Sequence, residues 1–83
     1  MPHSPQDKKR ALARLKRIKG QSEALMRAIE AETPCAHLLQ QIAALRGAVG
    51  SLMAEVLESH LRETQGAASG LDEINRILKT YLK

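Results

Sequence analysis

The two side chains best suited to chemistry, a cysteine and a histidine, lie at opposite ends of one predicted helix. Cys35 falls in its first turn, where unpaired N–H groups and the helix dipole stabilise a thiolate, which is both a nucleophile and a metal ligand. His60 falls in its last turn and is 25 positions further along the chain. That spacing is a rise of about 37 Å, so a straight helix cannot bring both residues to one atom, yet they share a face to within about 20°.

Two copies of this helix that pack antiparallel would bring Cys35 of one copy to His60 of the other. The midpoint between these residues lies between Gly47 and Ala48, in a run of small residues that lets two backbones approach closely. We therefore expect a symmetric dimer with two equivalent sites. Taken singly, Cys35 could instead be a small buried apolar residue and His60 an ordinary interface residue.

The helix that carries both residues is predicted over 34–64, with Thr33 as its N-cap and Pro34 at its first position. A break at Gly47 or Gly50 would invalidate the dimer described above. The apolar residues of this helix alternate steps of four and three, which is a heptad-like seam. They are Leu38, Ile42, Leu45, Val49, Leu52 and Val56.

A first helix is predicted from Pro5 to about Ala31. Ser4 is its N-cap and Asp7 follows three positions later, which is close to a capping box. Its seam shows the same alternating spacing. The turn at 32–33 is short, so we expect the first two helices to form an antiparallel hairpin.

A short third helix is predicted after the flexible stretch QGAASG, with Ser69 as its N-cap. Such a short helix is marginal alone, so it should pack on the bundle or on a neighbouring dimer. Its apolar face consists of Leu71, Ile74, Ile77, Leu78, Tyr81 and Leu82. The predicted fold class is all-α, with three helices per chain and hairpins that pair into a four-helix-bundle dimer, itself part of a dimer of dimers.

Length and composition limit the classes of protein to which this chain could belong. Eighty-three residues make one domain, which we take as 1–83. The single cysteine excludes an internal disulfide and is typical of a reducing cytoplasm. The sequence contains no apolar run long enough to predict a membrane span, and its first residues lack a signal-peptide core. The sequence also contains no glycine-rich phosphate loop, HExxH motif or nucleophile elbow, so no enzyme is indicated.

Positive charge is concentrated near the N-terminus. Residues 8–19 carry seven Lys and Arg and no acid, so this stretch holds +7 against −3 elsewhere, within a formal net charge of +4. Such a stripe predicts a polyanionic partner, most simply nucleic acid, although it could also be a solvated face. Arg46 lies near the dimer midpoint, where a symmetric pair of guanidinium groups favours a bound phosphate between them; packing of its aliphatic stem is the alternative.

The runs MPHSPQDKKR and QQIAALRGAVGSLMAEVLESHLRET, with Cys35 between them and LKTYLK at the end, resemble the CsoR/RcnR/FrmR family of small bacterial repressors. The resemblance covers essentially the whole chain. It implies dimers of helical hairpins that form a tetramer and bind operator DNA until an effector at the cysteine weakens that binding. By this resemblance the DNA contacts are Arg14, Arg17 and Arg46, supported by Lys16 and Lys19.

Branches of this family sense different effectors. Copper sensors carry a second cysteine four residues after the histidine, and nickel/cobalt sensors carry a histidine there. This chain has Thr64 at that position, which is a poor ligand for such metals. The segments MPHSP and SHLRET are most similar to the formaldehyde-responsive FrmR branch, in which Pro2 and Cys35 are the reactive pair.

The implied reaction is chemically sound. After removal of Met1, the secondary amine of Pro2 condenses with formaldehyde to an iminium ion, which the Cys35 thiolate captures as a methylene bridge. No cofactor is required. The alternative is a repressor that senses zinc, nickel, cobalt or copper through His3, Cys35 and His60. A remoter alternative is a structural helical oligomer without a regulatory role.

Overall fold

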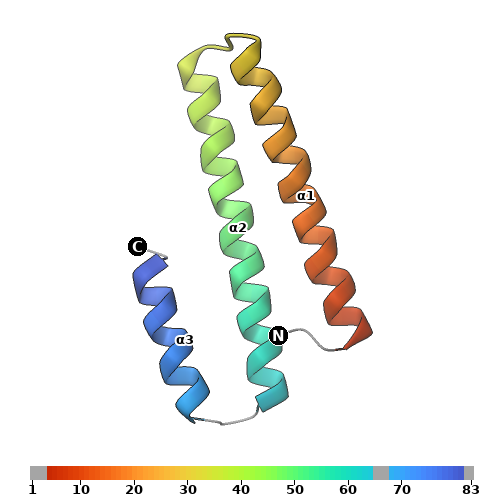
Figure 1. Ribbon diagram of the computed structural model, residues 1–83, viewed down its shortest axis with the longest axis vertical. Coiled ribbons are helices and arrows are strands. Elements are labelled where there is room, and N and C mark those ends of the chain that lie inside the picture. The colour runs from red at the N-terminus through yellow and green to blue at the C-terminus, as the bar shows by residue number, and fades with distance from the viewer. Residues whose placement is uncertain (1–3, 65–67, 82–83) are drawn as a thin grey trace.

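The computed structural model describes residues 4–64 and 68–81, with side chains over 4–63 and 72–80. It contains α1 (Pro5–Glu30), α2 (Cys35–Thr64) and α3 (Ala68–Tyr81) (Figure 1). The described residues include no strand, so the prediction of an all-α chain with three helices is confirmed. Pro2 and His3 lie outside the described residues, as does Leu82.

The start of α1 follows the predicted capping pattern. Ser4 is extended, with φ −70° and ψ 150°, and its hydroxyl accepts a hydrogen bond of 3.0 Å from the Asp7 N–H. Pro5 needs no hydrogen bond at the first position, and the Asp7 carboxylate suits the positive end of the helix dipole. The helix passes through Gly20 without interruption and ends one residue before the predicted Ala31, which is its C-cap.

The turn after α1 is a Schellman motif closed by an unusual residue. The Glu32 N–H donates to the Ile29 carbonyl (3.1 Å) and the Thr33 N–H donates to the Ala28 carbonyl (3.0 Å). Glu32 has a φ of 56°, a left-handed conformation that normally favours glycine. This turn reverses the chain, so α1 and α2 form the predicted antiparallel hairpin (Figure 1).

Two predicted helix starts differ from the structure. Helix α2 begins at Cys35, one residue later than predicted, and the Pro34 carbonyl accepts the first helical hydrogen bond from the Leu38 N–H (3.2 Å). The Thr33 N–H closes the preceding turn, so that turn extends through Thr33. In α3, Ser69 is already the second helical residue, since the helix begins at Ala68. Neither Gly47 nor Gly50 breaks α2.

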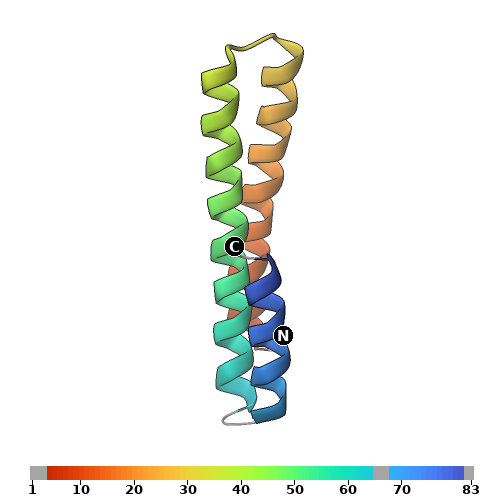
Figure 2. The same ribbon diagram turned by 90° about the vertical axis from the view of Figure 1, so that its left-hand side faces the viewer.

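The three helices make a flat, elongated molecule of 49 × 29 × 12 Å. After α2 the chain turns back, and α3 runs alongside the second half of α2 (Figures 1 and 2). An apolar groove of about 460 Å³ lies between these two helices, lined from α3 by Ile74, Ile77 and Leu78. A molecule only 12 Å thick is a single layer of helices, which is too thin to enclose a hydrophobic core.

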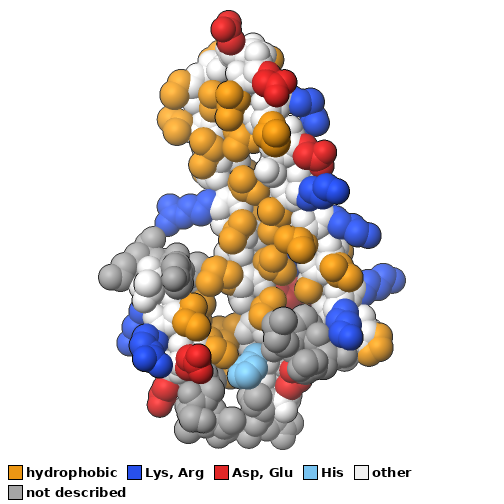
Figure 3. Space-filling view, in the orientation of Figure 1, with side chains coloured by type: hydrophobic (Ala, Val, Ile, Leu, Met, Phe, Trp, Pro, Cys, Tyr) orange, Lys and Arg blue, Asp and Glu red, His pale blue; other side chains and the backbone are white. Residues whose placement is uncertain are grey.

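Apolar side chains accordingly stay accessible in the single chain. No apolar residue in the described part is buried, and large ones such as Met26 and Leu39 (each 59% exposed) and Leu12 (56%) face solvent. Figure 3 shows hydrophobic side chains gathered along much of the visible hairpin face. The two buried residues among those described are polar: Asp7 at 8% exposure and Ser59 at 0%.

Candidate nucleic-acid interface and effector site

The structure keeps Cys35 and His60 far apart within one chain. Cys35 is exposed at the start of α2, beside the closed end of the hairpin. His60 is half-buried near the other end of α2, where it lines the groove against α3. No group of three or more His, Cys, Asp or Glu residues within the described ranges could hold a metal ion. Any site that uses both residues therefore needs a second chain.

The basic stretch of α1 is divided between two sides of the helix. Arg10, Arg14 and Arg17 follow helical spacing and share one pocket with Glu55 of α2. Lys16 and Lys19 instead line a separate hollow with the exposed Leu12 and Leu15. Lys19 is five positions after Arg14, which corresponds to a rotation of about 140°. The arginines and lysines predicted to contact DNA thus lie on different faces of one chain.

Arg46 lies on a third surface. It lines a hollow on α2 together with Ile42, Val49 and Met53. Its position is nine residues from Glu55, a rotation of about 180° around α2. A single chain therefore does not bring Arg46 to the pocket of Arg14 and Arg17.

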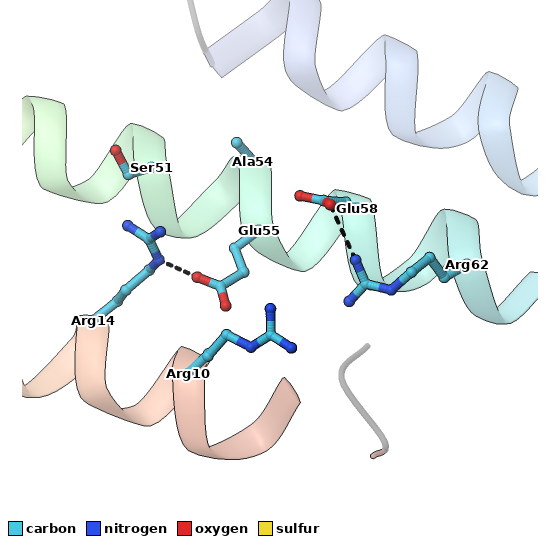
Figure 4. Close-up of a pocket in the computed structure, with 7 residues that line it drawn as sticks. All are labelled: Arg10, Arg14, Ser51, Ala54, Glu55, Glu58 and Arg62. Carbon is cyan, nitrogen blue, oxygen red and sulfur yellow. Dashed lines mark hydrogen bonds and ion pairs between the residues drawn. The ribbon is translucent and has the colours of Figure 1, made fainter. Parts of the chain in front are cut away.

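Arg14 forms an ion pair across the hairpin, from its Nε to the Glu55 Oε2 (Figure 4). The Glu55 side chain is only 12% exposed, whereas the Arg14 side chain is 44% exposed. The other Glu55 oxygen, Oε1, is buried without a hydrogen-bond partner among the described residues. Residues 14 and 55 are 41 positions apart. Because periodicity within a helix does not reveal which residues of another helix face it, sequence analysis missed Glu55.

A second network fixes the open end of the hairpin. The Arg62 guanidinium donates to Asp7 Oδ1 (2.8 Å), Glu58 Oε1 (3.1 Å) and Ser59 Oγ (3.3 Å), which ties the last turn of α2 to the first turn of α1. Desolvation acts to raise the pKa of Asp7. The hydrogen bonds from Arg62 and Ser4 and the positive charges of Arg62 and Arg10 outweigh it and lower that pKa below its ordinary value.

These side chains surround a polar pocket of about 280 Å³ between α1 and α2 (Figure 4). Three arginines contribute to it, and each is partly accessible: Arg10 at 60%, Arg62 at 47% and Arg14 at 44% side-chain exposure. Guanidinium groups bind phosphate through parallel N–H donors. The arginine side of α1 is therefore chemically suited to a nucleic-acid backbone.

Comparisons with known proteins agree on one family. The profile of the family described as metal-sensitive transcriptional repressor matches residues 7–80. An Escherichia coli protein named transcriptional repressor RcnR homolog is 41% identical over the full length of both chains. An uncharacterised Serratia marcescens protein encoded in the bioA 5′ region is 47% identical, also over the full length of both.

A solved structure gives the same result for the fold. A variant of the formaldehyde-responsive regulator FrmR from Salmonella enterica serovar Typhimurium superimposes with a TM-score of 0.83 and 48% sequence identity. The match covers 96% of this chain and 99% of that one. No helix in the described part of the chain is long and apolar enough to cross a membrane.

Proposed function

Because this chain belongs to the family of metal-sensitive transcriptional repressors, we propose that it binds operator DNA and is released when formaldehyde links Pro2 to Cys35. The family consists of transcriptional regulators, and we assign no catalytic residue and no required cofactor. The observation that carries the proposal is the likeness to FrmR over 96% of this chain, together with Pro2 and an accessible Cys35. By the family resemblance, Thr64 stands where other branches carry a metal ligand.

The proposed reaction balances without an oxidant. The Pro2 nitrogen adds to the formaldehyde carbon, and loss of water gives an iminium ion. The Cys35 thiolate then attacks the iminium carbon, which forms the C–S bond and returns the nitrogen to a neutral amine. The net product is one N–CH₂–S bridge and one water. Cys35 suits this role because its thiol is exposed at the first residue of a helix.

We propose that this bridge joins two chains. Ser4 lies at the open end of the hairpin and Cys35 beside the closed end, separated by the 26 residues of α1. That helix is about 39 Å long, whereas the two-residue step from Ser4 to Pro2 spans about 7 Å at most. Pro2 cannot reach Cys35 of its own chain. In an antiparallel pair of hairpins, the open end of the partner would lie beside Cys35.

Several observations support the oligomer. The described residues of one chain bury no apolar side chain, and large apolar residues stay 38–59% exposed. A second hairpin packed on this face would remove that surface from water, which is the main driving force of association. We propose that each chain acts as one domain over 1–83, in a dimer that pairs again into a tetramer.

For the DNA contacts we propose Arg14, Arg17 and Arg46, supported by Lys16 and Lys19. Because its proposed partner is operator DNA, we also propose that the protein acts in the cytoplasm. Binding of this kind releases counterions, so affinity should fall steeply with salt. A chain without salt-dependent affinity for duplex DNA would instead be the structural oligomer considered above.

Intact mass analysis under denaturing conditions, after brief exposure to dilute formaldehyde, tests the reaction. We expect a species of two chains joined by one added carbon atom, which peptide analysis assigns to Pro2 and Cys35, and no such species with Cys35→Ala. DNA release should be lost in the same variant. A thiol that stays free would refute aldehyde sensing. A bridge within one chain would refute the geometry above.

A metal-sensing repressor is the second candidate, favoured by the family description and by the likeness to the RcnR homolog. A thiolate with imidazoles suits zinc, nickel or cobalt. His3, Cys35 and His60 would be the ligands, drawn from two chains. Titration with zinc, nickel, cobalt and copper decides between the candidates. Release of DNA by one stoichiometric metal, with no response to formaldehyde, would establish the second.

A further inference from the structure

We propose that Glu55 is a positioning residue that holds Arg14 in the orientation needed to contact a DNA phosphate. The proposal rests on the DNA-binding function proposed above. Its basis is the ion pair between Arg14 of α1 and Glu55 of α2, in which one partner is largely covered and the other reaches the surface.

The contact uses only one edge of the guanidinium group. Arginine has one N–H donor on Nε and four on its terminal nitrogens. The Glu55 Oε2 pairs with Nε, and Figure 4 shows the terminal nitrogens of Arg14 turned away from the Glu55 carboxylate. The donors suited to a phosphate therefore remain available while the side chain is held.

The carboxylate is well placed to act as an anchor. Glu55 is 12% exposed, whereas Arg14 is 44% exposed, so the fixed end of the pair is inside and the donor end is outside. Glu55 also belongs to the other helix of the hairpin, so the contact orients Arg14 relative to both helices. Preorganisation of this kind lowers the conformational entropy that a long side chain loses on binding.

A carboxylate beside a DNA-binding face also has an opposite effect, because its negative charge repels phosphates. Variants can separate the two effects. Glu55→Gln removes the charge but keeps an oxygen that accepts from Nε. Glu58→Ala removes a neighbouring acid that pairs with Arg62 on its own helix and is 72% exposed, so it loses charge without touching Arg14.

The experiment measures affinity for a mixed-sequence duplex at several salt concentrations, because phosphate contacts need no particular sequence. We expect Glu55→Ala to weaken binding about tenfold per contacting chain and to reduce the slope of log K against log salt by about 0.9, as Arg14→Ala does. Glu55→Gln and Glu58→Ala should bind as tightly as wild type or more tightly. The double variant Glu55→Ala/Arg14→Ala should bind no more weakly than Arg14→Ala.

A merely structural role for Glu55 would give an additive loss in the double variant, which overturns the proposal. Wild-type or tighter binding by Glu55→Ala also overturns it, because Glu55 would then only compete with phosphate. Circular dichroism checks that each variant is helical. If Glu55→Ala is not, Glu55→Met keeps a stem of similar length and must show the same loss. Absence of salt-dependent binding in wild type would refute the proposed function instead.

Discussion

Glu32→Gly should stabilise the hairpin, because Glu32 holds the one conformation in the described backbone that a side chain disfavours. Its φ of 56° is left-handed, and it occupies the position after the C-cap of α1. The two hydrogen bonds of this turn come from backbone N–H groups, so glycine retains both. Only the steric strain of the Cβ is removed.

The expected gain follows from two opposing effects. A left-handed conformation costs an L-residue about 1–2 kcal/mol. Glycine loses about 0.5–1 kcal/mol more backbone entropy on folding. The net increase in unfolding free energy is thus about 0.5–1 kcal/mol, and each kcal/mol raises Tm by about 4–8 °C in a domain of this size.

Urea unfolding followed by circular dichroism measures this change, at one fixed chain concentration because association contributes to stability. Two control variants lose one negative charge, as Glu32→Gly does. Glu23→Gly makes the same substitution at an exposed position inside α1 and should destabilise by about 1 kcal/mol. Glu32→Ala removes the charge but keeps the Cβ and should bring no gain. Destabilisation by Glu32→Gly equal to that of Glu23→Gly would refute the strain at Glu32.

Ser4→Ala removes the N-cap of α1 and should lower the unfolding free energy by about 1 kcal/mol in urea titrations. Gly47→Leu should leave α2 helical but weaken the dimer in sedimentation experiments, since an added Cβ meets nothing within 4 Å in the single chain and any clash comes from a partner. Because the pKa of Asp7 is lowered on folding, its stabilising contribution is present above the ordinary pKa and is lost as pH falls through the lowered one. Arg62→Met should flatten this acid-side loss in urea midpoints measured against pH; an unchanged pH profile would contradict the Asp7–Arg62 contact.

Proteins of this size rarely bury much surface alone, and this chain is an extreme case. With no buried apolar residue in its described part, the chain needs a partner to cover its apolar surface, and the proposed bridge between Pro2 and Cys35 needs a partner as well. The length of α1, which separates Ser4 from Cys35, also indicates that Pro2 would meet Cys35 of a partner chain. In the proposed mechanism, loss of the dimer should therefore abolish DNA release by formaldehyde even where the thiol and the N-terminal amine are intact.

Local features could be predicted from the sequence because their causes are local. The spacing of apolar residues marks the apolar face of each helix, and Ser4, Pro5 and Asp7 together specify where α1 begins. Cys35 and His60 share a face because helical rotation per residue is fixed. The start of α2 was predicted one residue early: the turn after α1 extends through Thr33, and the Pro34 carbonyl accepts the first helical hydrogen bond.

Contacts between helices could not be predicted in this way. Helical rotation alone places Arg14 and Arg17 on another side of α1 than Lys16 and Lys19, but only the structure shows that the arginine side is the one beside Glu55 of α2. The sequence alone determined the helices, their faces and the residues capable of chemistry. The docking of α1 against α2, a long-range packing event, decided that Glu55 meets Arg14 and that Asp7 meets Arg62.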